Sequence, residues 1–95
     1  NAILPGAVNT EMLRRGLERD IFSETNDTNN TNNTNNTIIK SRIENLGRKH
    51  CIGRIGEPID IAQVILFLSD NTKSSYIIGQ SIVVDGGATI RLSTE

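Results

Sequence analysis

The spacing of apolar residues changes along the chain, and each change predicts a different element. Residues 1–4 form a short apolar run that Pro5-Gly6 ends, as at the end of a buried strand. Leu13, Leu17 and Ile21 then recur every four residues, which predicts a helix. Thr10 stands where the N-cap of that helix belongs. The first element is therefore a strand end and the second an amphipathic helix.

A polar tract separates this helix from the next one. Residues 25–37 read TNDTNNTNNTNNT, a three-residue repeat with no apolar side chain to offset the entropy of ordering it. We therefore expect a disordered surface insertion at about 24–37. After it, Ile39, Ile43 and Leu46 share one face of a second predicted helix, which runs from Ile38 to about Leu46.

The last third of the chain predicts a helix and a strand. Pro58 suits a first helical turn, and Asp60 complements the N-terminus of a helix that runs to Asp70. This helix is apolar nearly all round, so it needs cover on several sides. The β-branched run Ser81–Val84 predicts a strand of a parallel sheet that is buried on both faces. The order of elements is typical of the end of an α/β fold, and two strands alone are too few for a stable sheet.

Composition and charge narrow the possible functions. The chain has 95 residues, with 10 Lys and Arg against 11 Asp and Glu and a net charge of -1, so we expect no nucleic-acid partner. No apolar run approaches the roughly 20 residues that span a bilayer, so we expect no membrane partner. The single cysteine fits the reducing cytoplasm, where we expect the protein. Because the chain starts at Asn1 without a Met or a leader, we expect a piece of a longer protein.

Four segments together resemble the short-chain dehydrogenase/reductase family, which consists of NAD(P)-dependent oxidoreductases with a Rossmann fold. All four stand in the family's order and cover nearly everything outside the polar tract. The resemblance implies the C-terminal third of a Rossmann-like doubly wound parallel sheet, with its last two strands and flanking helices. The segments are Asn1-Ala-Ile-Leu-Pro-Gly-Ala-Val-Asn-Thr, Gly53-Arg-Ile-Gly-Glu-Pro-Ile-Asp-Ile-Ala, Tyr76-Ile-Ile-Gly-Gln and Ile82-Val-Val-Asp-Gly-Gly.

The resemblance implies a cofactor contact where the first strand ends. It assigns Pro5, Gly6, Val8 and Thr10 to the cofactor-binding segment. The backbone of Val8 would bracket the nicotinamide carboxamide of NAD or NADP, and the Thr10 hydroxyl would hydrogen-bond it. Gly6 would let the main chain approach a flat ring closely. Ligands of open α/β sheets bind beyond the carboxyl ends of the strands, which agrees with this place. A plain strand-to-helix turn capped by Thr10 also explains these residues.

The resemblance also implies an assembly and a lid. It places the 58–70 helix and the 81–84 strand at subunit interfaces, so we expect a homo-oligomer, with burial of the helix inside one subunit as the alternative. Residues 10–53 correspond to the substrate-covering lid. The polar tract therefore falls inside that lid, where a longer flexible loop costs little entropy.

The family's catalytic motifs do not occur in this sequence. It contains neither the glycine-rich phosphate motif nor Tyr-x-x-x-Lys, because the only tyrosine, Tyr76, is followed four places later by Gln80. We expect Tyr76 to be a packing residue. His50 and Cys51 raise the idea of a reactive thiol or a metal site, but neighbours on an extended chain point apart and zinc takes three or four protein ligands. We expect a surface histidine, a buried cysteine and no metal.

The sequence thus predicts the C-terminal part of an NAD(P)-dependent short-chain oxidoreductase. The complete protein would transfer hydride between a nicotinamide and a small-molecule alcohol or ketone. The 95-residue chain alone is expected to be inactive. An alternative is an inactive remnant that acts as an interaction module and docks onto an intact family member.

Overall fold

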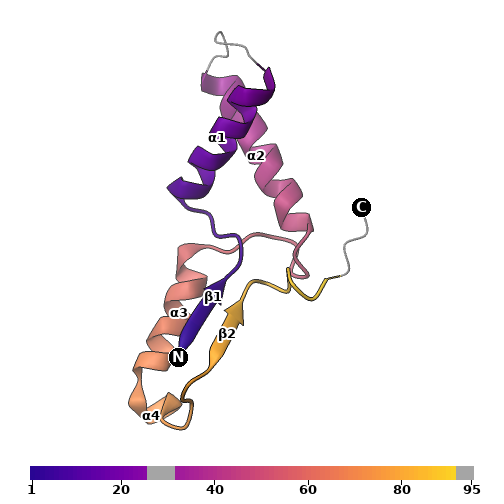
Figure 1. Cartoon of the computed structure of the whole chain (residues 1–95). Coiled ribbons are helices and arrows are strands. Elements are labelled where there is room, and N and C mark those ends of the chain that lie inside the picture. The colour runs from indigo at the N-terminus through magenta and orange to yellow at the C-terminus, as the bar shows by residue number, and fades with distance from the viewer. Residues whose placement is uncertain (26–31, 92–95) are drawn as a thin grey trace.

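A computed structural model describes residues 1–25 and 32–91 of the chain. The chain is elongated, with principal extents of 55 × 28 × 18 Å. Figure 1 shows a hairpin of two helices at one end and the strands with two further helices at the other. The elements follow in the order β1 (Ala2–Pro5), α1 (Glu11–Thr25), α2 (Asn32–Arg48), α3 (Pro58–Ser69), α4 (Asn71–Ser74) and β2 (Ser81–Val84).

The two strands come from opposite ends of the sequence and form a parallel pair. They pair along their whole length, with Pro5 opposite Val84. The side chain of Asn1 ties their beginnings together, because its amide donates to the carbonyl of Ile77 and its oxygen accepts from the N–H of Gln80, both at 2.9 Å. Parallel pairing needs a long crossover. The two carboxyl ends consequently meet at one edge of the sheet.

The helical hairpin is held by apolar burial and one ion pair. The first turn of α1 is capped as predicted, since the Thr10 hydroxyl oxygen accepts from the N–H of Leu13 at 3.3 Å. Ile21 of α1 and Ile39 of α2 are only 4% and 5% exposed. An ion pair of 2.5 Å between Arg42 and Glu24 links the two helices. These contacts hold α1 and α2 side by side (Figure 1).

The polar tract is more ordered than the sequence suggested. α2 begins at Asn32, so residues 32–37 are helical and the expectation of disorder is wrong for them, while residues 26–31 lie outside the described residues. α2 also continues to Arg48, two residues beyond the predicted end. The physical reason is that a helix nucleated by Ile39 and its neighbours extends at small cost, because Asn and Thr are only about 0.7 kcal/mol worse than Ala as helix formers.

The helix and strand of the last third lie where predicted, but this chain does not cover them. α3 has no buried residue, and Ile59, Ile65 and Leu66 are 59%, 51% and 66% exposed. Along β2 only alternate residues are half-buried, and Val83 is 53% exposed. The expected burial on both faces is therefore wrong for the described chain. Its two strands have no further layers against which to pack.

Within the described chain Tyr76 does not have the packing role expected for it. Its side chain is fully exposed. Ser74, at the end of α4, is buried instead, and its hydroxyl donates to the carbonyls of Leu68 and Asp70 at 3.0 and 3.1 Å. This short helix was not predicted, because four polar residues carry no apolar periodicity.

Candidate functional site

The carboxyl ends of the two strands form the base of the candidate site. The N–H of Gly6 donates to the carbonyl of Val84 at 3.1 Å and extends the strand pairing by one residue. A Cβ on Gly6 would lie 2.7 Å from the Cβ of Asp85 and 2.9 Å from its Cα. Contact with Asp85 therefore already requires glycine here, whether or not a flat ring also approaches. The two strand ends are in direct contact.

Val8 is held by its neighbours and leaves its own backbone groups free. The N–H of Gly56 donates to the carbonyl of Ala7, and the N–H of Asn9 donates to the carbonyl of Gly56, both at 2.8 Å. Backbone groups of successive residues in such a bridge point to opposite sides. The N–H and C=O of Val8 therefore point away from Gly56, and neither has a hydrogen bond among the described residues. A half-buried donor and acceptor lie side by side at this position.

Thr10 follows directly and has one hydrogen-bonding function still available. Its oxygen accepts from the N–H of Leu13, but a hydroxyl also carries a proton that can be donated. Thr10 is exposed. The capping role and the predicted carboxamide contact are thus compatible in the same side chain. Pro5 is the last residue of β1, and Gly6, Val8 and Thr10 follow it on the short segment before α1.

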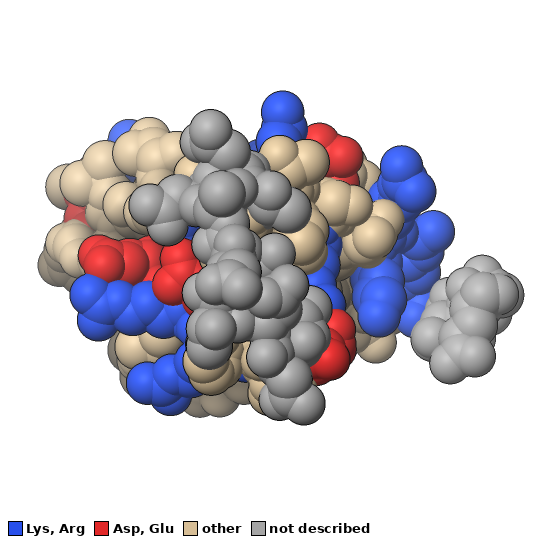
Figure 2. All heavy atoms as spheres, turned by 90° about the horizontal axis from the view of Figure 1, so that it is seen from above, with Lys and Arg blue, Asp and Glu red and all other residues tan. Residues whose placement is uncertain are grey.

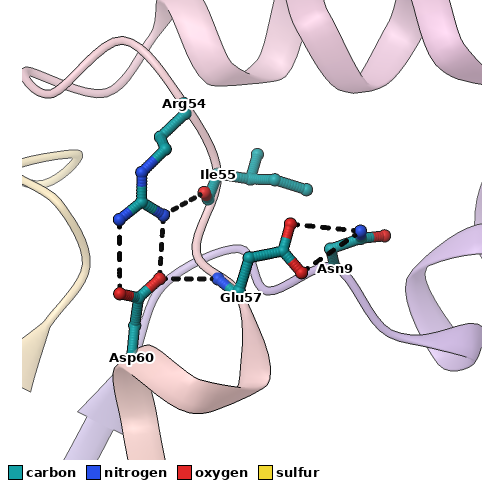
Figure 3. A network of polar contacts seen from close by, with 5 residues as sticks. All are labelled: Asn9, Arg54, Ile55, Glu57 and Asp60. Carbon is teal, nitrogen blue, oxygen red and sulfur yellow. Dashed lines mark hydrogen bonds and ion pairs between the residues drawn. The ribbon is translucent and has the colours of Figure 1, made fainter.

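A polar network fixes the start of α3 next to this segment (Figure 3). The carboxylate of Asp60 accepts two hydrogen bonds from the guanidinium of Arg54, at 2.8 and 3.2 Å, and one from the N–H of Glu57 at 2.7 Å. Glu57 in turn accepts from the side-chain amide of Asn9 at 3.3 Å. Arg54 also donates to the carbonyl of Ile55 at 3.0 Å. The network connects the loop after β1 with the loop before α3.

The charges in this network support one another. The hydrogen bonds from Arg54 and then from the Glu57 N–H lower the pKa of Asp60 to about 2. The same carboxylate raises the pKa of Arg54 above its ordinary value. Both groups are consequently ionised across the neutral range. The sequence indicated a helix N-terminus at Asp60 but not the ion pair, because Arg54 stands six residues away in a loop and matches no regular spacing.

Asp85 organises the turn after β2 in the same manner. Its carboxylate accepts from the hydroxyl and the N–H of Thr89, at 2.7 and 2.9 Å, and from the N–H of Gly87 at 2.9 Å. The bonds from Thr89 come first among the causes that lower the pKa of Asp85. Gly86 and Gly87 follow with positive φ angles of 60° and 84°, which favour glycine. The turn directs the chain back over the loop that contains His50 and Cys51.

His50 and Cys51 exchange the places predicted for them. His50 is 3% exposed, and its Nδ1 lies 2.9 Å from the carbonyl of Leu46, whereas Cys51 is exposed. The expectation of a surface histidine and a buried cysteine is therefore wrong. One hydrogen bond, to the end of α2, satisfies Nδ1 of the buried imidazole, while its Nε2 has no partner among the described residues. Cys51 lies against Gly87, with its Sγ 3.2 Å from that carbonyl. Among the described residues no group of His, Cys, Asp or Glu could hold a metal ion.

A small cavity lies between the two strand ends and the start of α3. Its volume is about 220 Å³. The residues around it bring together the segment after β1, the Arg54–Asp60 pair and the turn after β2. It is lined by Ala7, Val8, Ile52, Arg54, Gly56, Asp60, Ile61, Val84, Asp85 and Gly86. Of this lining, the sequence predicted only Val8 and its neighbours as part of a site. The other residues come from segments more than forty positions further along the chain.

Charges are mixed on the surface of the molecule. In the view from above (Figure 2), acidic and basic side chains lie next to one another, and neither sign covers the face. Glu11 and Arg15, one helical turn apart on α1, form an ion pair at 2.6 Å. Within the described residues, no helix is both long and apolar enough to cross a membrane.

Comparison with known proteins identifies the family of the chain. A family model described as enoyl-(acyl carrier protein) reductase matches residues 25–89. The short-chain dehydrogenase anuF of Penicillium roqueforti is 35% identical over 99% of this chain and 27% of its own length. A diacetyl reductase of Staphylococcus epidermidis is 35% identical over 96% of this chain and 31% of its own length.

A solved structure agrees with these relatives. The aldohexose dehydrogenase of Thermoplasma acidophilum superimposes with a TM-score of 0.77 and 31% identity over 100% of this chain and 33% of that protein. The chain therefore spans about a third or less of the length of these relatives. Its parallel strands and helices have the Rossmann-type α/β arrangement of dehydrogenases, as predicted. The chain belongs to the short-chain dehydrogenase/reductase family.

Proposed function

We propose that this chain forms the carboxamide-binding segment and the substrate lid of an NAD(P)-dependent oxidoreductase. The observation that carries the proposal is the free N–H and C=O pair of Val8, held in place by the bridge of its neighbours to Gly56. A primary carboxamide has one donor and one acceptor group, so it matches this pair. The hydroxyl proton of Thr10, two residues after Val8, offers a further donor. NAD or NADP is the cofactor that supplies such a group.

The residues present fit the carboxamide end of this cofactor. Val8 and Thr10 would hold the carboxamide, and Pro5-Gly6 would form the turn on which they stand. The nicotinamide, when bound, would supply or accept the hydride. In the direction of reduction, the carbonyl carbon of a ketone gains the hydride and its oxygen gains a proton. Tyr76 is fully exposed and Gln80 follows it at the lysine position of the family's motif, so this chain offers no acid of that type.

The 95-residue chain by itself should consequently have no activity. The groups that bind the pyrophosphate and transfer the proton would come from polypeptide with the family's remaining motifs. We also propose that the complete protein is a cytoplasmic homo-oligomer joined through the 58–70 helix and the 81–84 strand. The exposed apolar side chains of α3, among them Ile59 and Leu66, support a contact there, because leaving them in water forfeits about 25 cal/mol for each Å² of apolar surface.

The same exposed helix supports the second candidate, an interaction module without activity. In this case α3 and β2 would dock onto an intact family member. Both candidates use the same surface, and they differ in whether Val8 and Thr10 contact a cofactor after docking.

The test is reconstitution with a relative. The chain is coexpressed with the part of the Staphylococcus epidermidis diacetyl reductase that lies outside the match, and reduction of diacetyl is followed by the absorbance of NADH or NADPH. Activity that needs both pieces supports the oxidoreductase. Comigration on size-exclusion chromatography without activity supports the interaction module. Two pieces that neither comigrate nor react would refute both.

Variants of Thr10 separate capping from cofactor contact. Thr10→Ser keeps the cap and the hydroxyl, Thr10→Asp keeps the cap but loses the O–H donor, and Thr10→Val loses both. We expect KM for the cofactor to rise about five-fold in Thr10→Asp with unchanged thermal stability, since one lost hydrogen bond is worth roughly 1 kcal/mol. Thr10→Val should lose stability as well. If Thr10→Asp binds the cofactor as well as Thr10→Ser does, the hydroxyl makes no such contact.

A further inference from the structure

A second and larger pocket lies in the lid, and its lining indicates what the lid recognises. It has a volume of about 480 Å³. It is lined by Asn9, Arg14, Asn36, Ile39, Lys40, Ile43 and Glu44. These residues come from the segment after β1, from α1 and from α2. Figure 1 shows that the two helices diverge toward the strands.

Two cations in this lining have no acidic partner among the described residues. Within residues 1–25 and 32–91, Lys40 takes part in no ion pair, and the side chain of Arg14 has a single long contact of 3.5 Å, from its Nε to the side-chain oxygen of Asn9. Elsewhere on the same helices Arg15 and Arg42 each bind a carboxylate. The terminal nitrogen atoms of the Arg14 guanidinium are therefore available, and these are the atoms that hold carboxylates with two parallel hydrogen bonds.

The remaining lining limits the size and shape of what binds. Ile39 is buried and Ile43 is half-buried, so one wall of the pocket is apolar. Glu44 is the single acidic side chain of the lining, which leaves one net positive charge from three charged groups. Asn9 stands between Val8 and Thr10 in the sequence, so the pocket borders the segment to which we assign the carboxamide.

We propose that the lid pocket binds the carboxylate of a small keto or hydroxy acid with a short aliphatic body. Arg14 and Lys40 bind the carboxylate, and Ile43 contacts the aliphatic part. The inference rests on the proposed function and specifies its substrate class. In the reduction, the keto carbon gains a hydride from the reduced nicotinamide and the keto oxygen gains a proton. The carboxylate takes no part in the bond changes and serves to orient the molecule.

Binding to the full chain tests the pocket without any chemistry. The probe is levulinate, a keto acid, and its neutral control is methyl levulinate, which has the same ketone and aliphatic body. We expect levulinate to shift the amide NMR signals of Asn9, Arg14 and Lys40, and the ester to bind roughly ten-fold more weakly. Raising the salt concentration should weaken the binding of levulinate and leave the binding of the ester unchanged, because salt screens the attraction between charges over such distances.

Three variants identify the groups responsible. Arg14→Met and Lys40→Met keep the aliphatic stems of the side chains, and each should lower the affinity for levulinate about five-fold or more. Glu44→Gln removes the negative charge that repels the carboxylate and should raise the affinity for levulinate by a similar factor. Arg19→Met is the matched control, because Arg19 is an exposed cation of the same helix that lines a different hollow. Equal binding of acid and ester, or equal weakening by Arg19→Met, would overturn the inference.

Reconstitution gives a second readout and separates this inference from the proposed function. In the active complex, kcat/KM for levulinate should exceed that for methyl levulinate, and Arg14→Met should remove most of the difference. If the complex reduces both equally, the substrate class is wrong and the oxidoreductase stands. If levulinate binds through Arg14 and Lys40 but no complex reduces any ketone, the pocket stands and the oxidoreductase is wrong.

Discussion

Replacing Gly6 by alanine tests the contact between the two strand ends. The added Cβ would lie 2.7 Å from the Cβ of Asp85, 2.9 Å from its Cα and 3.3 Å from its carbonyl oxygen. All three atoms belong to the backbone or to its first side-chain atom, so no flexible group can move aside. The strand ends must separate by several tenths of an ångström, which breaks the 3.1 Å hydrogen bond from Gly6 to Val84.

The expected loss of stability follows from these contacts. Overpacking at a rigid contact costs about 1–3 kcal/mol, and a lost backbone hydrogen bond adds about 1 kcal/mol. We therefore expect Gly6→Ala to lower the free energy of unfolding by about 2–4 kcal/mol in urea titrations followed by circular dichroism. The loss should occur without any cofactor.

A second glycine provides the matched control. Gly16 lies within α1, and a Cβ there would meet nothing within 4 Å. Gly16→Ala should stabilise the protein by about 0.5–1 kcal/mol, because alanine is the better helix former. Opposite signs for the two substitutions are the expected result. If Gly6→Ala is as stable as the parent chain and loses only cofactor affinity, the strand-end contact does not explain the glycine.

Three further predictions concern the polar contacts. The pKa of Asp60 is lowered to about 2 in the folded state, so its bonds to Arg54 stabilise the fold above pH 4 and should be lost as the pH falls from about 4 toward 2. In thermal melts across this range, the melting temperature of Asp60→Asn should depend less on pH than that of the parent chain. Asp85→Asn should lower the melting temperature and increase amide exchange at Thr89, and unchanged exchange there would contradict the turn as described. Ser74→Ala removes the hydroxyl that donates to the Leu68 carbonyl, whereas the Asp70 carbonyl keeps the N–H donors of Lys73 and Ser74; it should cost about 1 kcal/mol in urea titrations, and an unaffected midpoint would show that the hydroxyl is not needed.

The sequence was sufficient for those elements whose signals are local. Thr10 marked the start of α1 and Ser81–Val84 marked β2, because an N-cap and a β-branched run depend on near neighbours. Their parallel pairing followed from the resemblance to the family. Residue chemistry alone would not have given the register, since the two strands lie nearly eighty positions apart.

The errors about His50 and Cys51 have one physical origin. Burial was assigned by residue type, so Cys51 was expected inside and His50 outside. In the structure the Leu46 carbonyl at the end of α2 satisfies one nitrogen of the buried imidazole, whereas Cys51 stays exposed beside the turn after β2. The bridge of Val8 to Gly56 was invisible for the same reason. Contacts between distant loops leave no pattern in composition or spacing.

The helical hairpin has a consequence for how this sequence can vary. The repeat unit of the polar tract is three residues, and three residues turn a helix by about 300°, not by a whole turn. A repeat unit gained inside the apolar part of α2 would carry Ile43 away from the pocket. A unit gained between Thr25 and Asn32 leaves that face unchanged, because the position of α2 is set from its other end by Ile39 and by the His50 contact. Among natural copies of this gene, changes in repeat number should therefore occur at the far end of the hairpin and leave the lid pocket intact.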